Sequence, residues 1–339
     1  MRFLSDGTQT QKHHLLKTET VFDSFEKMML LSLLGIQGAR EKVGDWKESW
    51  IQGAREKWET GRNPGLRSGV VVVCWYVGGV EFMENVRDTK IIALAGKGGV
   101  GKTSLAAVIV KLLAEAFPDK RILAIDADPA VGLSTALGVD VGITIDDIRK
   151  SVIAAVEDGE TKAAVELLGE AKYQIFDALV EQDGFSFIAV GRPETAGCYC
   201  KVNAYLKDVI QMLSGNFDYV VIDGEAGIEQ INRRVMEKVT HLMLVTDSSK
   251  KGTQVIQTIK KVADELVMYE KIGAVVNRMP DISMKQYIDT GDIPVLTYIP
   301  TDSQLAAFDL TGQNVFYLPD DSNIVNGARE ALHKIEILG

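Results

Sequence analysis

Three kinds of feature are scarce in this sequence, and each absence excludes a class of protein. Only 3 cysteines occur among the 339 residues, which is too few for a disulfide framework and is typical of a reducing compartment. The longest apolar run, Val70–Val77, falls far short of the roughly 20 residues that cross a bilayer. Polar residues follow Arg2 closely and no apolar core with a cleavage site comes after them, so a secretory signal is not expected. We therefore expect a cytoplasmic protein without stable membrane association.

The chain also lacks an excess of positive charge, which is the third scarce feature after cysteines and long apolar runs. The formal net charge is −10 at pH 7, whereas a general nucleic-acid binder needs clustered lysine and arginine to neutralise phosphates. We expect no nucleic-acid partner, although a local basic patch stays compatible with the composition. What is present is ordinary, because 46% hydrophobic and 25% charged residues predict a globular chain with a sizeable core.

The first 82 residues differ in character from the rest. All 4 tryptophans lie before Met83, and the heptapeptide Ile-Gln-Gly-Ala-Arg-Glu-Lys occurs at residues 36–42 and again at 51–57. Two copies are too few for a solenoid, which needs at least three repeats.

Two hypotheses account for this stretch, residues 1–82. One is an appended regulatory segment with short helices around residues 15–34 and 41–58. The other, which we favour, is that the native protein begins at Met83, shortly before a compact domain at 83–339. The upstream stretch is then poorly ordered or not native.

From Lys90 onward, short apolar runs alternate with helical patterns, which is typical of a parallel sheet wrapped by helices. The alternation predicts an α/β fold with a mostly parallel sheet of about seven strands and helices on both faces. The stretch at 144–180 has helical spacing and no strand, so we interpret it as a helical insertion after the second strand. The expected strands are 91–95, 121–126, 186–190, 219–223, 241–245, 273–276 and 295–299. The expected helices are 104–117, 201–213, 252–266 and 326–338.

A glycine-rich loop directly follows the first of these strands and opens a helix. Its sequence from Gly96 to Thr103, Gly-Lys-Gly-Gly-Val-Gly-Lys-Thr, matches the Walker A pattern in the structural context that the pattern requires. Glycines let the backbone wrap tightly with its N–H groups pointing inward, and the helix N-terminus attracts phosphate. Lys102 is expected to reach the β and γ phosphates, and Thr103 to ligate Mg²⁺. The sequence therefore predicts ATP and Mg²⁺ as cofactors of a P-loop NTPase.

Carboxylates end two further strands at the sheet edge where ligands of open α/β folds bind. Asp126 and Asp128 close the second strand, and Asp223 closes the strand at 219–223 as in a Walker B segment. Asp223 is expected to hold Mg²⁺ through water. Each of these residues taken singly is also compatible with a strand-end cap.

Two of the three cysteines, Cys198 and Cys200, stand two positions apart after the strand at 186–190. In an extended segment both sulfurs point to the same side. Two sulfurs do not complete a tetrahedral thiolate site, but two copies that meet across a twofold axis supply four. A pair of packed thiols is the alternative, and a local disulfide is disfavoured by its tight ring. We do not count Cys74 as a ligand.

The extra lysine of the loop, Lys97, is not needed in an ordinary P-loop. Lys-Gly-Gly-Val-Gly-Lys-Thr resembles the deviant Walker A signature of the class that contains MinD, ParA and the nitrogenase iron protein. The resemblance implies a MinD-like fold and an ATP-sandwich homodimer in which Lys97 reaches the nucleotide of the partner subunit. It also implies that Asp128 orients the attacking water and that Asp126 lies near the Mg²⁺ ion. A solvated surface lysine is the alternative for Lys97.

The same class suggests a pocket for the base. Asn277 and Arg278 end a strand that resembles the one offering asparagine to adenine, and Pro300 and Asp302 resemble the loop that closes over the base. Asn277 is equally compatible with a strand-end cap. The nucleotide-binding residues expected in all are Gly96, Lys97, Gly98, Gly99, Val100, Gly101, Lys102, Thr103, Ser104, Asn277, Arg278, Pro300 and Asp302. The expected catalytic residues are Lys97, Lys102 and Asp128, and the expected metal ligands are Thr103, Asp126 and Asp223 for Mg²⁺ and Cys198 and Cys200 for Ni²⁺ or Zn²⁺.

The segment from Gly191 through Cys198-Tyr199-Cys200 to Asn203 narrows the resemblance to the CooC-type ATPases. That family matures nickel enzymes, notably carbon monoxide dehydrogenase and acetyl-CoA synthase. The resemblance implies an ATPase that dimerises, gathers a divalent metal between the paired cysteines, and passes it to the apo-protein of a nickel enzyme.

Two other functions stay open at this stage. A positioning ATPase similar to MinD or ParA, acting on membrane or DNA, predicts a basic amphipathic tail or a basic surface, whereas residues 326–339 mix both charges. A [4Fe–4S] reductase similar to the nitrogenase iron protein needs one cysteine from each of two separate segments, whereas Cys198 and Cys200 are neighbours.

Overall fold

The structure is a computed structural model, and it describes part of the chain. The predicted helices around 15–34 and 41–58, both copies of the heptapeptide, and Cys198 lie outside the described residues. The chain divides into two units, of which the second contains residues 69–71, 86–151 and 172–339, and the first contains the rest. The described residues are 70–77, 80–87, 89–128, 132–157, 170, 173–191, 200–224, 235, 238–267 and 269–339.

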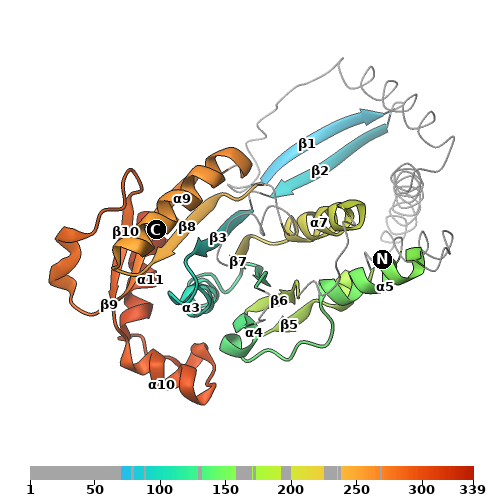
Figure 1. The fold of residues 1–339 in the computed structure, drawn as a ribbon. Coiled ribbons are helices and arrows are strands. Elements are labelled where there is room, and N and C mark those ends of the chain that lie inside the picture. The colour runs from blue at the N-terminus through green and yellow to red at the C-terminus, as the bar shows by residue number, and fades with distance from the viewer. Residues whose placement is uncertain are drawn as a thin grey trace, which may run out of the picture. The chain divides into compact units, whose positions relative to one another are not determined.

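The second unit is built on one 8-stranded sheet with the strand order β10-β9-β8-β3-β7-β4-β6-β5. All its pairings are parallel except that between β5 and β6. The α/β fold and each of the seven expected strands are thereby confirmed (Figure 1). The strands are β3 (Lys90–Gly96), β4 (Ile122–Asp126), β5 (Val180–Gln182), β6 (Phe185–Ala189), β7 (Tyr219–Asp223), β8 (His241–Thr246), β9 (Lys271–Met279) and β10 (Val295–Pro300).

The central strands are buried along most of their length. Every residue of β4 and of β8 is buried, as expected of parallel strands covered on both faces, which read as continuous apolar runs. Because all the parallel strands end at the same edge, the loops that follow β3, β4, β7, β8 and β9 meet there.

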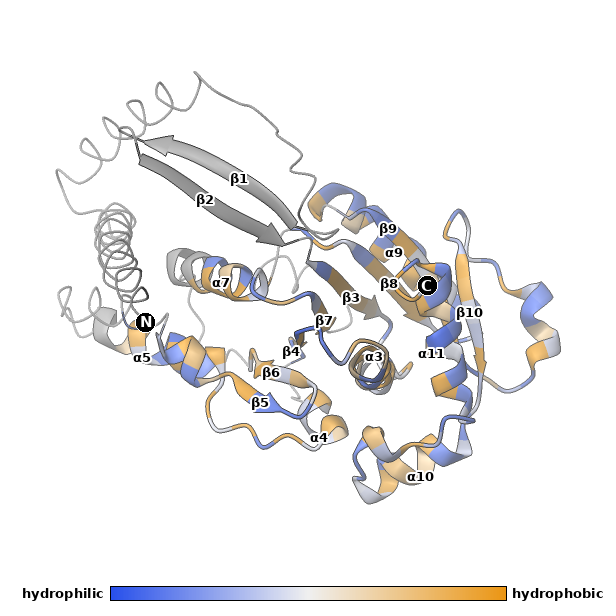
Figure 2. Ribbon diagram, turned by 180° about the vertical axis from the view of Figure 1, so that it is seen from behind, coloured by the Kyte–Doolittle hydropathy of each residue, from blue (hydrophilic) through white to orange (hydrophobic). Residues whose placement is uncertain are grey.

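Helices cover both faces of the sheet. Helix α3 (Lys102–Ala116) packs on β3, β4 and β7 and against α11 (Asn323–Lys334), whereas α9 (Lys250–Leu266) packs on β8 and β3. The steps from β3 to β4 and from β8 to β9 run in opposite directions along the sheet. Right-handed crossovers therefore put α3 and α9 on opposite faces, and the two views agree (Figures 1 and 2). Helices α9 and α11 carry both hydrophilic and hydrophobic residues along their length (Figure 2).

The remaining helices connect or follow the strands. Four of them, α4, η1, α10 and η2, were not predicted from the sequence, whereas α7 was predicted and α5 lies in the stretch interpreted as a helical insertion. Their bounds are α4 (Gly132–Leu137), α5 (Ile145–Glu157), α7 (Cys200–Ser214), η1 (Ile282–Tyr287), α10 (Ser303–Thr311) and η2 (Val315–Tyr317).

Two strands precede the large sheet in the chain. β1 (Val70–Val77) and β2 (Val80–Arg87) form a separate 2-stranded sheet, and β1 is the longest apolar run of the sequence. The domain boundary expected at Met83 stays a prediction. Within the part of the chain that the structure describes, no helix is long and apolar enough to cross a membrane.

Candidate nucleotide-binding site

The loop between β3 and α3 needs glycine at two of its positions. Gly96 ends β3 at a φ of 153°, and a Cβ atom there would lie 2.0 Å from the carbonyl oxygen of Val245 on the neighbouring strand. Gly101 caps α3 in the left-handed region at a φ of 89°, where a Cβ atom would lie 2.7 Å from the Asn277 amide nitrogen. Only glycine fits both positions without strain, so the backbone takes the tight course that the sequence pattern predicts.

Lys102 opens α3 and is buried, with only 7% of its surface exposed. Its ammonium group donates to the carbonyl oxygen of Lys97 at 3.4 Å, back across the loop. Thr103 and Ser104 follow in the first turn of the helix. A buried cation beside a helix N-terminus concentrates positive potential, which favours an anion such as phosphate.

Asp126 and Asp223 lie in register on the neighbouring strands β4 and β7, and both are fully buried. The two oxygens of Asp126 accept backbone N–H bonds, one from Asp128 at 3.1 Å and one from Leu133 at 2.9 Å. Asp126 therefore fixes the backbone that carries Asp128. Burial, reinforced by the negative charge of Asp223, raises the pKa of Asp126.

Asp223 is the unusual member of this pair. Neither of its buried oxygens accepts a hydrogen bond of regular geometry from the residues that the structure describes. Burial raises the pKa of its carboxyl group, while the nearby Thr103 hydroxyl and Lys102 ammonium act in the opposite direction. A buried carboxylate without hydrogen bonds is costly and needs an explanation.

A Mg²⁺ ion fits this arrangement. It accepts oxygen ligands, usually one or two carboxylates with phosphate oxygens and water. Among the described residues, no group of three or more His, Cys, Asp and Glu side chains is placed to hold a metal. Phosphate oxygens and water would complete the shell of a Mg²⁺ ion here. Thr103 and Asp223 would hold the ion, with Asp126 behind them.

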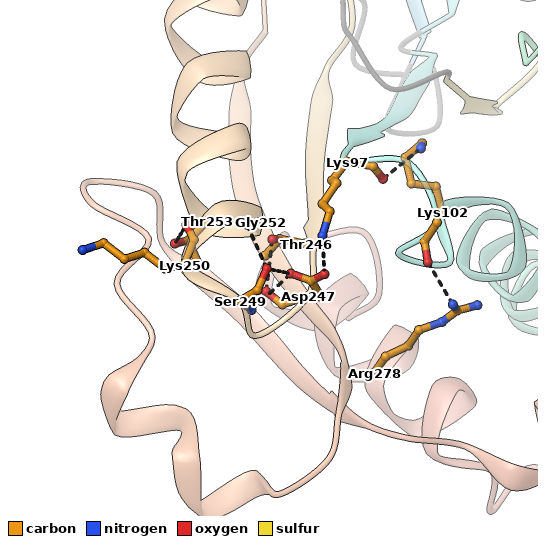
Figure 3. A network of polar contacts seen from close by, with 10 residues as sticks. Lys97, Lys102, Thr246, Asp247, Ser249, Lys250, Gly252, Thr253 and Arg278 are labelled. Carbon is orange, nitrogen blue, oxygen red and sulfur yellow. Dashed lines mark hydrogen bonds and ion pairs between the residues drawn. The ribbon is translucent and has the colours of Figure 1, made fainter.

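Two side chains at the carboxyl end of β9 donate hydrogen bonds to backbone carbonyl groups of the phosphate loop. The Asn277 amide donates to the carbonyl oxygen of Val100 at 2.9 Å, and the Arg278 guanidinium donates to that of Gly99 at 2.8 Å. Figure 3 shows Arg278 reaching toward the loop. Arg278 has a left-handed φ of 58°, a strain that is typical of functional positions. The contact of Asn277 with a base stays a prediction, and the loop contact was not predicted.

Pro300 and Asp302 follow at the end of β10, where Pro300 pairs with Met279 of β9. The Asp302 carboxylate accepts four hydrogen bonds, from the backbone N–H groups of Gln304, Leu305 and Ile324 and from the Ser322 hydroxyl. It thereby caps α10 and secures the start of α11. The base contact that the sequence predicts for Pro300 and Asp302 stays a prediction, and these bonds give Asp302 a structural role of its own.

Lys97 points away from Lys102 and forms an ion pair that the sequence does not reveal. Its ammonium nitrogen lies 2.7 Å from an oxygen of Asp247, and Figure 3 shows the two side chains directed toward each other. Strands β3 and β8 are neighbours with Gly96 opposite Val245, so the residues just beyond each strand end meet. Asp247 directly follows the buried strand β8, and a carboxylate at this strand end is the sequence signal for the contact.

The cysteine site lies almost wholly beyond the described residues. Cys200 is the first residue of α7, but its side chain is not described. Cys198 and residues 225–234, which follow Gly224, are not described either. The predicted metal ligands Cys198 and Cys200 therefore stay predictions.

The fold and the loop geometry define an α/β protein with a P-loop nucleotide site. The chain belongs to the CobQ/CobB/MinD/ParA nucleotide binding domain family, whose model matches residues 91–315. The family is ATP-binding, which agrees with the site described above.

This chain matches individual relatives over most of the relatives' length. An uncharacterised ATP-binding protein of Methanocaldococcus jannaschii is 36% identical over 72% of this chain and 98% of the relative. The carbon monoxide dehydrogenase accessory protein CooC of Rhodospirillum rubrum is 30% identical over 67% of this chain and 89% of the relative.

A solved structure shares the fold. The septum site-determining protein MinD of Pyrococcus horikoshii, complexed with Mg-ADP, has a TM-score of 0.54 at 22% identity, over 73% of this chain and 96% of that one. At this level of identity the likeness concerns the fold alone.

Proposed function

We propose that the protein is an ATP-hydrolysing dimeric switch that gathers a divalent metal ion and delivers it to the apo-protein of a nickel enzyme. The observation that carries the proposal is the position of the Cys-x-Cys segment along the chain. It connects the end of β6, where Ala189 is in register with Asp126, to the start of α7 at Cys200. The chain therefore leaves β6 at the sheet edge that carries the nucleotide site, shortly before Cys198 and Cys200 in the sequence.

The chemistry of two thiolates supports a shared site. Each chain contributes Cys198 and Cys200, and a structural thiolate site for a divalent ion takes four ligands in a tetrahedron. Two chains related by a twofold axis supply four thiolates. Closure of the dimer on ATP then sets the distance between the two cysteine pairs, so hydrolysis releases the ion.

The nucleotide site supplies the switching energy. Lys102 and the loop N–H groups hold the phosphates, Lys97 of one chain reaches the nucleotide of the other, and Asp128 orients the attacking water. Bound Mg²⁺ neutralises phosphate charge. The similarity to the accessory protein CooC supports carbon monoxide dehydrogenase as the type of client.

Metal analysis of the full chain, purified and mixed with Mg-ATP, tests the proposal. We expect about one Ni²⁺ or Zn²⁺ per dimer, because four thiolates complete one shell. Cys198→Ser and Cys200→Ser each remove two of the four thiolates from the dimer and should abolish most of the metal binding while ATP binding persists.

Cys74→Ser is the matched control and should keep the metal. Two metal ions per dimer, or full binding in the Cys198→Ser/Cys200→Ser double variant, would rule out the shared site. Four irons per dimer with visible absorption would favour a reductase.

A further inference from the structure

The ion pair between Lys97 and Asp247 joins two residues of the same chain that are 150 positions apart. The two side chains are about one-third exposed, at 31% and 29%, so the contact is neither deeply buried nor freely solvated. The Lys97 ammonium group therefore faces the loop after β8 of its own chain. A lysine held in this way is not free to enter another subunit.

Asp247 is itself held in place by the start of α9. One of its oxygens accepts from the Ser249 backbone N–H at 3.1 Å and from the Ser249 hydroxyl, while the other accepts from Lys97. The Ser249 hydroxyl also accepts from the Gly252 N–H at 3.0 Å and so caps the helix. Figure 3 shows this chain of contacts running from the helix to the loop. The carboxylate is thus oriented before Lys97 binds it.

Gly252 supports the same arrangement. A Cβ atom at this position would lie 2.2 Å from the Asp247 oxygen that Ser249 contacts. A side chain at position 252 would therefore push Asp247 out of reach. Burial alone would raise the pKa of Asp247, but the bonds from Lys97 and Ser249 outweigh it and hold the pKa below its ordinary value, so the carboxylate is charged at neutral pH.

We propose that Asp247 is a positioning residue that latches Lys97 within its own chain, and that this latch opens when a second copy with bound nucleotide docks. The proposal rests on the proposed function, because it requires that Lys97 acts in the partner subunit. Opening the latch costs part of the free energy that dimerisation yields. Asp247 thereby sets the nucleotide and protein concentrations at which two copies join.

The expected effect follows from the strength of the pair. A partly exposed ion pair favours the closed form by on the order of fivefold. Two latches open in each dimer, so removing both should tighten the dimer by about 25-fold in its dissociation constant.

The test compares the full wild-type chain with Asp247→Asn, both with a non-hydrolysable ATP analogue, Mg²⁺ and a chelator that binds Ni²⁺ and Zn²⁺ but leaves Mg²⁺ in solution. Asparagine keeps the shape of the side chain and the bond to Ser249, but loses the charge that binds Lys97. Dimerisation is followed by light scattering over a range of protein concentrations, and we expect the midpoint to fall about 25-fold.

Asp264→Asn is the matched control. Asp264 lies on the same helix and pairs with Lys260 at 2.8 Å, so the variant loses the same charge and one ion pair away from the loop. It should leave the midpoint close to that of the wild type. A midpoint in Asp247→Asn that is unchanged, raised or matched by the control would overturn the latch.

A second measurement does not depend on dimers. In nucleotide-free monomer, the rate of acylation of the Lys97 amine, read by mass spectrometry, should rise severalfold in Asp247→Asn. Equal rates in the two proteins would also overturn the latch.

The two proposals fail differently. Absent metal binding with a tightened Asp247→Asn dimer contradicts only the metal function. Normal metal binding with an unchanged Asp247→Asn dimer contradicts only the latch.

Discussion

Asp223 ends one parallel strand of the sheet and Asp302 follows another, and both are buried, yet their surroundings differ completely. Asp302 accepts four hydrogen bonds and secures two helices, whereas both oxygens of Asp223 lack a partner of regular geometry among the described residues. A fold satisfies its buried polar groups wherever they serve stability alone. The unsatisfied carboxylate therefore marks the place where the protein is completed by something it binds, and the satisfied one marks a structural corner.

Replacing Asp302 should have the largest effect on stability. Asp302→Ala removes two helix caps and leaves the buried Ser322 hydroxyl without its acceptor, so the free energy of unfolding should fall by about 3 kcal/mol. Urea unfolding of nucleotide-free protein measures the change. Asp281→Ala is the control, since Asp281 caps only one short 3-10 helix at the surface, and its effect should be much smaller.

Acid should reduce the difference in unfolding free energy between the wild type and Asp302→Ala. Although burial would raise the pKa of Asp302, the bonds from Ser322 and three backbone N–H groups hold it below the ordinary 3.8. A lowered carboxyl pKa stabilises the fold above the ordinary pKa, and that contribution is lost as the pH falls through the folded value. Wild type and Asp302→Ala should therefore converge below pH 3.8. A gap that stays constant as the pH falls below 3.8 would contradict the assignment. If Asp302→Ala bound ATP more weakly than the wild type, that result would instead support the base contact that the sequence predicts for Asp302.

Two glycines with a left-handed backbone, one after α10 and one in the phosphate loop, allow the same comparison at the level of the backbone. Gly312, after α10, has a φ of 65° and open space around a Cβ atom, whereas Gly101 in the phosphate loop is crowded by Asn277. Gly312→Ala should cost about 1 kcal/mol of stability without affecting ATP binding. Gly101→Ala should weaken ATP binding by about tenfold, equivalent to about 1.4 kcal/mol, because the loop has to shift. Equal ATP affinities in the two variants would show that the loop geometry is unimportant.

The smallest effect on stability is expected at Asp223. Asp223→Asn removes a buried charge whose oxygens accept no hydrogen bond of regular geometry from the described residues, so the unfolding free energy of the nucleotide-free protein should change by less than about 1 kcal/mol or rise. The same urea measurement compares it with Asp302→Ala. A loss as large as that of Asp302→Ala would mean that Asp223 is a structural residue and would remove the contrast between the two sites.

The sequence predicts the sheet well because its strands are short apolar runs, three of which end in glycine or aspartate, at Gly96, Asp126 and Asp223. It misses β5, since two of the three residues in Val180–Gln182 are exposed and carry no apolar pattern. It also misses α10, whose signal was the capping position of Asp302 that was interpreted as a base contact.

The candidate site also has a part that the sequence predicts and a part that it does not. The phosphate loop is local in sequence, so the spacing of its glycines and lysines was sufficient to predict it. The contacts of Lys97 with Asp247 and of Asn277 with the loop join residues that are 150 and 177 positions apart. They depend on which strands are neighbours in the sheet, which the sequence alone does not state.

The central claim is that the unsatisfied carboxylate belongs to a Mg²⁺-nucleotide site. Calorimetric titration of ATP into wild type and Asp223→Asn, each with Mg²⁺ or with a chelator, tests it most directly. Wild type should bind ATP at least about tenfold more tightly with Mg²⁺ than with the chelator, and Asp223→Asn should lose most of that difference. An ATP affinity that depends on Mg²⁺ equally in both proteins, or in neither, would contradict the account.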